Sequence, residues 1–129
     1  MENSAQQSKN FDIRQRTLKF SVLIIRLITL LPKSPAGFAI ANQVVRSGTS
    51  VGANVEEAQD ASTRKEFIYT MTISLREARE TEYWLRIIKE TSLILDSKLD
   101  EALQEVSELI KILTAIVKKT KASTFKKLD

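Results

Sequence analysis

Hydrophobic residues recur at intervals of three and four positions through four long segments of this chain, which is the spacing of one face of a helix. The pattern is clearest in the last segment, from about Ser97 or Lys98 to Lys119. Its apolar residues keep the strict four-three alternation of a coiled-coil seam: Leu99, Leu103, Val106, Ile110, Leu113 and Val117. Three glycines and two prolines are too few to punctuate repeated hairpins, so the pattern predicts an all-α protein.

Breaking and capping residues separate the other three segments. The first is expected over residues 11–31, because the two prolines that follow remove amide donors and disfavour helix in the residues before them. The third is expected to follow Thr63, an N-cap residue with Glu66 at the spacing of a capping box, and to run to about Thr91.

The second segment, residues 35–60, contains two glycines, which cost a helix about 1 kcal/mol each relative to alanine. We favour one continuous helix, because the apolar sector keeps its phase across Gly48 and Gly52. The alternative is a break at residues 47–49 that gives two shorter helices.

Short connections between long helices favour antiparallel packing of neighbours. We therefore predict an antiparallel up-down-up-down four-helix bundle formed by residues 10–121. Residues 1–9 are predicted to be a disordered N-terminal tail, and residues 122–129 a basic C-terminal tail. A single domain is expected, because 129 residues are enough for one core and too few for two.

The first and third helices carry more apolar residues than one bundle core uses. The first has one stripe at Leu18, Val22 and Ile25 and a second on the opposite side. Surplus apolar faces usually mark a partner surface, so we predict a homo-oligomer. The candidate interface residues are Phe20, Ile24, Tyr69, Ile73, Trp84 and Ile87. We interpret Trp84 as an anchor between subunits; stacking of Tyr83 and Trp84 on nucleic-acid bases is the alternative.

The chain has no histidine and no cysteine, which excludes Ser-His, Cys-His and His-metal chemistry. We therefore predict no enzymatic activity, no catalytic residue and no cofactor. A cluster of glutamates is the one candidate for a Mg²⁺ site: Glu56, Glu57, Glu77, Glu80 and Glu82. Arginines at positions 76, 79 and 86 interleave with these acids and more simply neutralise them, so no metal is predicted.

Polar residues along one edge of the second helix are interpreted as structural. We expect Arg46 and Glu57 to pair with the third helix, with Glu77 among the partners, and Asn54 to satisfy a buried hydrogen bond that fixes the helix register. The alternative is a rim that binds a ligand.

A net charge of +4 suggests phosphate contacts, which reward clustered lysine and arginine. The candidate nucleic-acid contacts are Arg16, Lys19, Arg26, Lys118, Lys119 and Lys121. The alternative is that these residues only solvate helix ends and the C-terminal tail.

Two stretches, SVGANVEEAQ and SLREARETEYWLRII, resemble the bacterial four-helix bundle family of 23S rRNA intervening-sequence proteins. The resemblance extends over most of the chain, as far as about Ser123. It implies an antiparallel four-helix bundle assembled as a ring of five, with no established enzymatic activity. The family also looks related to the accessory proteins of diversity-generating retroelements, which work with a reverse transcriptase.

The expected function is thus a non-enzymatic oligomeric scaffold or adaptor that binds RNA or DNA electrostatically. The alternative is a protein–protein module that docks to a nucleic-acid enzyme such as a reverse transcriptase. The first ten residues lack the pattern of a secretory signal, and the apolar run at residues 21–31 is about half of a membrane span. A cytoplasmic protein with no membrane contact is expected.

Overall fold

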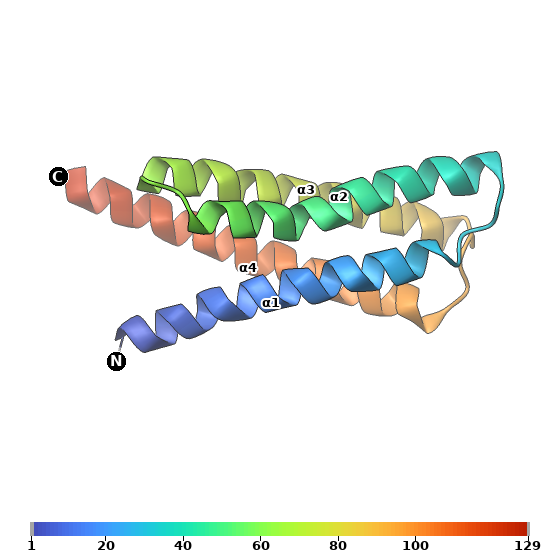
Figure 1. Ribbon diagram of the computed structural model, residues 1–129, viewed down its shortest axis with the longest axis horizontal. Helices are drawn as coiled ribbons and strands as arrows, with labels where there is room; N and C mark the ends of the chain where they lie inside the picture. The colour runs from blue at the N-terminus through green and yellow to red at the C-terminus, as the bar shows by residue number, and fades with distance from the viewer. Residues whose placement is uncertain (1, 129) are drawn as a thin grey trace.

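Four helices make up the computed structural model, which describes the backbone of residues 2–128 and the side chains of residues 13–123 (Figure 1). They are α1 (Glu2–Ile28), α2 (Pro35–Gln59), α3 (Arg64–Glu90) and α4 (Ser97–Leu128). Successive helices run in opposite directions and no strand occurs in this part of the chain, so the predicted all-α four-helix fold is confirmed. The tails predicted for residues 1–9 and 122–129 lie largely outside the residues described with side chains and stay predictions.

α2 is one continuous helix through Gly48 and Gly52, as favoured from the phase of its apolar residues. Its start is fixed by Ser34, whose Oγ accepts a hydrogen bond from the amide of Gly37 at 3.1 Å, with Pro35 in the first turn. A Cβ at Gly37 would lie 1.8 Å from the carbonyl oxygen of Pro32, so only glycine fits this tight entry into the helix.

α3 begins at the predicted N-cap. The Oγ1 of Thr63 accepts from the amide of Glu66 at 3.1 Å, and the carboxylate of Glu66 accepts from the amide of Ser62 at 2.8 Å. At the other end Ser92 adopts a φ of 55°, and two bonds close a Schellman motif: Ser92 N to Lys89 O at 3.1 Å and Leu93 N to Ile88 O at 3.2 Å. These caps set the length of α3.

One apolar core runs along the middle of the bundle, and every helix contributes to it. α1 turns inward the stripe that contains Phe20, Ile24 and Leu27, all at most 1% exposed. On α4 the predicted seam is correct for Leu99, Val106, Leu113 and Val117, whereas Leu103 and Ile110 are half-buried and Ala102 and Leu109 take the fully buried places. The buried sector of α4 is turned by about one residue because this helix packs against both α1 and α3.

α1 and α2 approach each other closely where α2 lacks side chains. A Cβ at Gly48 would lie 3.0 Å from two side-chain carbons of Ile24, and a Cβ at Gly52 would lie 3.2 Å from Cβ, Oγ1 and the carbonyl oxygen of Thr17. Contacts of 3.0 Å between carbons are well inside the usual 3.5–4.0 Å. The two glycines therefore form the surface on which the inward stripe of α1 rests.

α2 and α3 are joined by hydroxyl groups that are fully buried and satisfied. The Oγ1 of Thr81 donates to the Oγ of Ser47 at 2.9 Å, and the Oγ of Ser74 donates to the carbonyl oxygen of Val51 at 2.7 Å. Each pair connects helices across a dry interface, where an unpaired hydroxyl would cost about 1–3 kcal/mol.

The substitution Gly48→Ala tests how tightly α1 and α2 pack against each other. We expect Gly48→Ala to lower the free energy of unfolding by about 1 kcal/mol, because overpacking a filled core costs ~1–3 kcal/mol and exceeds the ~1 kcal/mol that alanine gains in a helix. Urea denaturation provides the measurement. Ala53, exposed on the same helix, is the matched control: Ala53→Gly should destabilise by about 1 kcal/mol through helix propensity alone. A Gly48→Ala variant more stable than the parent protein would contradict the tight contact.

Candidate interaction surfaces

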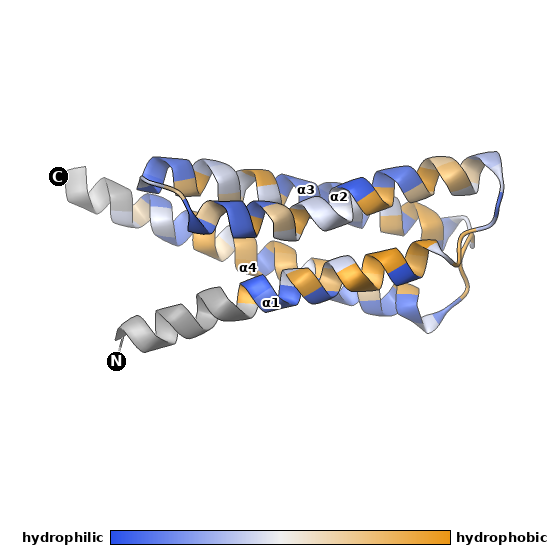
Figure 2. Cartoon of the chain, viewed as in Figure 1, coloured by the Kyte–Doolittle hydropathy of each residue, from blue (hydrophilic) through white to orange (hydrophobic). Residues whose placement is uncertain are grey.

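The outer face of α1 is apolar and open to solvent. We define it by Leu18, Val22 and Ile25, which are 66%, 40% and 50% exposed; Leu30, 43% exposed, follows in the turn after the helix. Hydrophobic residues accordingly run along the coloured part of α1 in Figure 2. A helix that is apolar on all sides is normally covered on all sides.

α1 therefore has the predicted surplus apolar face, but this face is the stripe of Leu18, Val22 and Ile25 and not the stripe that contains Phe20 and Ile24. Phe20 and Ile24, predicted as interface residues, belong to the core. The spacing of apolar residues gives both stripes equal weight, and the choice between them is made by α2, whose glycines receive the side of α1 that carries Thr17 and Ile24.

Two bidentate ion pairs hold α1 to its neighbours. The Nε and one terminal nitrogen of Arg14 bind the two carboxylate oxygens of Glu56 on α2 at 3.0 and 2.9 Å. Arg16 binds both oxygens of Glu105 on α4 at 3.1 and 2.5 Å. Arg16, a predicted nucleic-acid contact, thus has a structural partner within the bundle.

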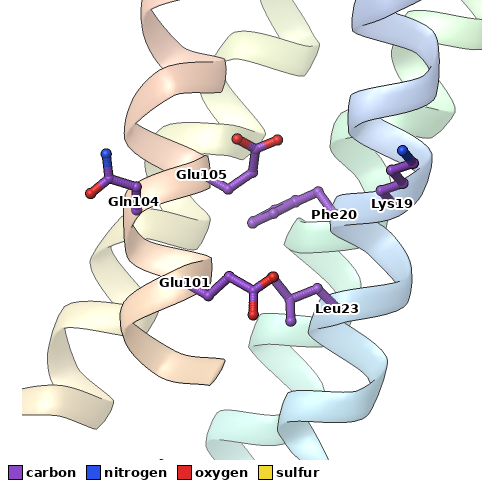
Figure 3. A pocket seen from close by; sticks show the side chains of 6 residues that line it. All are labelled: Lys19, Phe20, Leu23, Glu101, Gln104 and Glu105. Atoms are coloured by element: carbon purple, nitrogen blue, oxygen red, sulfur yellow. The ribbon is translucent and has the colours of Figure 1, made fainter. Parts of the chain in front are cut away.

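A hollow of about 350 Å³ lies between α1 and α4 (Figure 3). Phe20 and Leu23 project into it from α1, and Glu101 and Glu105 reach toward it from α4. Lys19, another predicted nucleic-acid contact, also lines this hollow. Because one of the two acids is already bound by Arg16, the hollow has mixed rather than strongly negative character.

The six predicted nucleic-acid contacts do not form one patch. Lys118, Lys119 and Lys121 are exposed together on the C-terminal half of α4, where the sequence from Leu109 to Leu128 contains no acidic residue. Arg26 is exposed near the end of α1, and this end lies at the opposite end of the bundle from the α4 C-terminus (Figure 1). The three lysines of α4 are the compact part of the predicted set.

Arg46 makes the predicted contact with α3, but at the surface. Its guanidinium binds Glu77 at 3.3 Å, Gln43 of its own helix at 3.2 Å and, closest of all, Glu80. The hydrogen bond that Arg46 donates to Glu80 raises the pKa of Arg46, which therefore stays charged. The side chain is 48% exposed, so its assignment as a buried residue is wrong.

The other two polar residues of this edge differ as well. Glu57 is exposed, so the prediction of a buried pairing is also wrong for it. Asn54 is half-buried and its Nδ2 donates to the carbonyl oxygen of Ser50, one turn earlier in the same helix, at 2.8 Å. Asn54 therefore bonds within α2 and makes no hydrogen bond to another described helix.

Sequence reasoning missed a basic surface on α3. Because Glu77 and Glu80 are bound by Arg46, they do not neutralise the arginines of their own helix. Arg76, Arg79 and Arg86 are exposed and form no ion pair with a described residue. The signal in the sequence was their spacing of three and seven residues, which sets them on one side of the helix.

Trp84 is half-buried and packs against the core. Its ring meets that of Tyr83 edge to face, with centroids 5.3 Å apart and planes at 68°. The indole Nε1 is buried and has no hydrogen-bond partner among the described residues. Ile73 and Ile87 are half-buried too, whereas Tyr69 is 69% exposed. The role of these residues between subunits stays a prediction.

Within the described residues, no group of three or more acidic residues is placed to hold a metal ion. No helix of this part of the chain has the length and apolar character needed to cross a membrane.

The family model described as 23S rRNA-intervening sequence protein matches residues 9–115, which include α2, α3 and most of α1 and α4 but not the lysines at 118, 119 and 121. The chain belongs to this family. A solved structure from Bacteroides thetaiotaomicron, a protein of unknown function from the S23 ribosomal protein family, is 36% identical and superposes with a TM-score of 0.78. The match covers 85% of this chain and 98% of that one. No curated protein matches the chain.

The Arg14–Glu56 pair predicts a pH effect. Its hydrogen bonds and charge lower the pKa of Glu56 below the ordinary value. The pair therefore stabilises the fold above the pKa that Glu56 has in the unfolded chain, and this contribution is lost as pH falls through the lower, folded-state pKa. Both side chains are exposed, so we expect a small effect that salt screens.

Carboxyl NMR titration tests this directly. Arg14→Gln should return the pKa of Glu56 toward its ordinary value, whereas Arg26→Gln, which removes an exposed charge elsewhere on α1, should leave it unchanged. Equal titration of Glu56 in the parent protein and in Arg14→Gln would show that the pair does not persist in solution.

Proposed function

We propose that this protein is a non-enzymatic scaffold that assembles with copies of itself through the outer face of α1 and binds RNA or DNA electrostatically. The observation that carries the proposal is the solvent exposure of Leu18, Val22 and Ile25 along one side of a helix whose other side is already in the core. These residues cover about 10 Å of helix length. An exposed apolar strip of this kind favours a protein partner.

The charges around the strip favour a contact between unlike surfaces. From residue 13 to residue 33 the sequence has five cations and no acid. Two copies of the outer face of α1 placed against each other would bring Lys19 and Arg26 of each copy together, and like charges oppose such a contact. A head-to-tail contact avoids this, and it gives a ring when the rotation between neighbouring copies closes. We propose a ring of five, the number that the family resemblance implies.

The surface that receives α1 is proposed to be the side of α3 next to α2. Ile73 lies four residues before Glu77, and Trp84 lies four residues after Glu80. Both acids bind Arg46 of α2, so all four residues share that side of α3. A half-buried tryptophan beside an isoleucine is the composition of an interface anchor.

Nucleic-acid binding is supported by the distribution of charge. The net charge is +4, and Lys118, Lys119 and Lys121 occupy a stretch of α4 without acidic residues. In a ring each such cluster is repeated in every subunit, and repeated weak contacts to one chain of nucleic acid raise the overall affinity.

The assembly is tested by native mass. We expect the parent protein to sediment as a multiple of the 14.6 kDa chain, and Val22→Glu/Ile25→Glu to shift it toward single chains, because charges would be buried in the contact. Leu95→Glu is the control, since Leu95 is 88% exposed in the connection between α3 and α4. A parent protein with the mass of one chain at micromolar concentration would remove the proposal of self-assembly.

Binding of nucleic acid is tested by a filter-binding salt titration. We expect the logarithm of the association constant for single-stranded RNA or DNA to fall linearly with the logarithm of salt concentration, with a slope of about −2 or steeper, because three lysines each contribute about −0.7. Tight binding that does not respond to salt would contradict an electrostatic mechanism. No binding at low salt would leave the scaffold role alone.

A further inference from the structure

The outer face of α3 alternates cations and tyrosines. We define it by Lys65, Tyr69, Arg76, Arg79, Tyr83 and Arg86, all of them exposed. Tyr69, Arg76 and Tyr83 are seven residues apart, as are Arg79 and Arg86, so each set stays on one side of the helix over two turns. The face extends about 30 Å, at about 1.5 Å per residue.

Its positive charge is only partly compensated within the bundle. Of the five acids of α3, Glu77 and Glu80 bind Arg46 of α2 and Glu66 caps the start of the helix. Glu82 and Glu90 lie one turn before and one turn after Arg86 and form no ion pair with a described residue. The four cations of the outer face form no ion pair with a described residue. The arrangement therefore offers several free guanidinium groups, which bind phosphate oxygens with two parallel hydrogen bonds.

One end of this outer face contains a recess. A hollow of about 300 Å³ is lined by Tyr83, Arg86, Ile87, Glu90 and Thr91. Tyr83 is 59% exposed, yet its ring is braced by the edge-to-face contact with Trp84, which fixes its orientation. An aromatic ring and an isoleucine thus stand beside a guanidinium and a carboxylate, and both groups can form hydrogen bonds with the edge of a base.

We propose that the outer face of α3 is a binding site for single-stranded nucleic acid. Lys65, Arg76, Arg79 and Arg86 hold phosphates at intervals along the strand, and an unpaired base stacks on Tyr83 in the recess, with Tyr69 offering a second stacking surface. This site rests on the proposed nucleic-acid binding and specifies its ligand and its place. It lies on a different helix from the lysine cluster of α4.

The geometry favours a single strand over a duplex. α3 lies between α2 and α4, which flank it along its length, so it presents a broad surface and cannot insert as a lone helix into a major groove about 12 Å wide (Figure 1). The exposed tyrosine rings need bases whose faces are free, and the bases of a duplex are stacked on one another. Stacking also tolerates any base sequence, so little sequence preference is expected.

The test uses fluorescence anisotropy of the full chain with a labelled 20-nucleotide oligo(dT), oligo(U) and a duplex of equal length. Four variants separate the contributions: Tyr83→Ala, Tyr69→Ala, the triple variant Arg76→Gln/Arg79→Gln/Arg86→Gln, and Lys118→Gln/Lys119→Gln/Lys121→Gln as a control with the same charge loss. Because Tyr83 touches Trp84, circular dichroism confirms the fold of each variant, and Tyr69→Ala tests stacking where no such ring contact occurs.

We expect Tyr83→Ala to weaken binding of the single strands about 5- to 150-fold with an unchanged salt slope, since stacking of one base contributes that range. The arginine variant should lower the salt slope by about 2 and bind single strands more weakly than the α4 lysine variant does. The duplex should bind more weakly than either single strand and respond little to the tyrosine changes.

Three results would overturn the site. Both tyrosine variants binding single strands like the parent protein would remove the stacking surface. Loss of binding in the α4 lysine variant with full binding in the arginine variant would move the contact to α4, and the proposed function would stand. Displacement of the oligonucleotide by poly-glutamate at equal charge concentration would indicate a docking surface for acidic proteins instead. If the parent protein binds no nucleic acid at low salt, the proposed binding function itself fails.

Discussion

The close approach of α1 to α2 is the contact on which the rest of the structure depends. α1 has two apolar stripes of similar strength, and either could face the core. Thr17 and Ile24 occupy the space that a side chain at Gly52 or Gly48 would need, and this close packing favours one rotation of α1 about its axis. That rotation buries Phe20 and Leu27, exposes Leu18 and Val22, and places Arg14 and Arg16 beside their carboxylate partners on either side.

Some features of the fold could be predicted because they depend only on nearby residues in the sequence. Helix existence, the N-cap at Thr63 and the continuity of α2 follow from local rules that need no knowledge of neighbours: capping geometry, proline positions and the phase of one apolar sector. The inward stripe of α1 could not be read in this way, because both stripes satisfy the same periodicity and the deciding contact comes from another helix. The sequence was enough to predict the partners of Arg46 on α3, but not the exposure of its side chain. A helical wheel gives the direction in which a side chain points and not how deeply it is buried.

The ion pairs that Arg46 forms with Glu77 and Glu80 change which charges α3 presents to the solvent. The interleaved acids and arginines of α3 predict, from the sequence alone, that these charges neutralise one another along the helix. In the folded chain one arginine from α2 takes two of those acids, and the arginines of α3 are left to the solvent. The electrostatic character of a helix therefore depends on which of its charges are paired by neighbouring helices. A count of charges along the sequence does not reveal this pairing.

The hydroxyl pairs between α2 and α3 fix how these two helices are aligned along their length. Ser47, Ser74 and Thr81 each need a partner at one particular height, so α2 and α3 cannot slide past each other by a turn without leaving a buried hydroxyl unpaired. α1 is aligned with α2 in a different way, by the close contacts at Gly48 and Gly52 and by the ion pair of Arg14 with Glu56. One helix, α2, therefore selects the alignment of both of its neighbours, on one side by hydrogen bonds and on the other by shape.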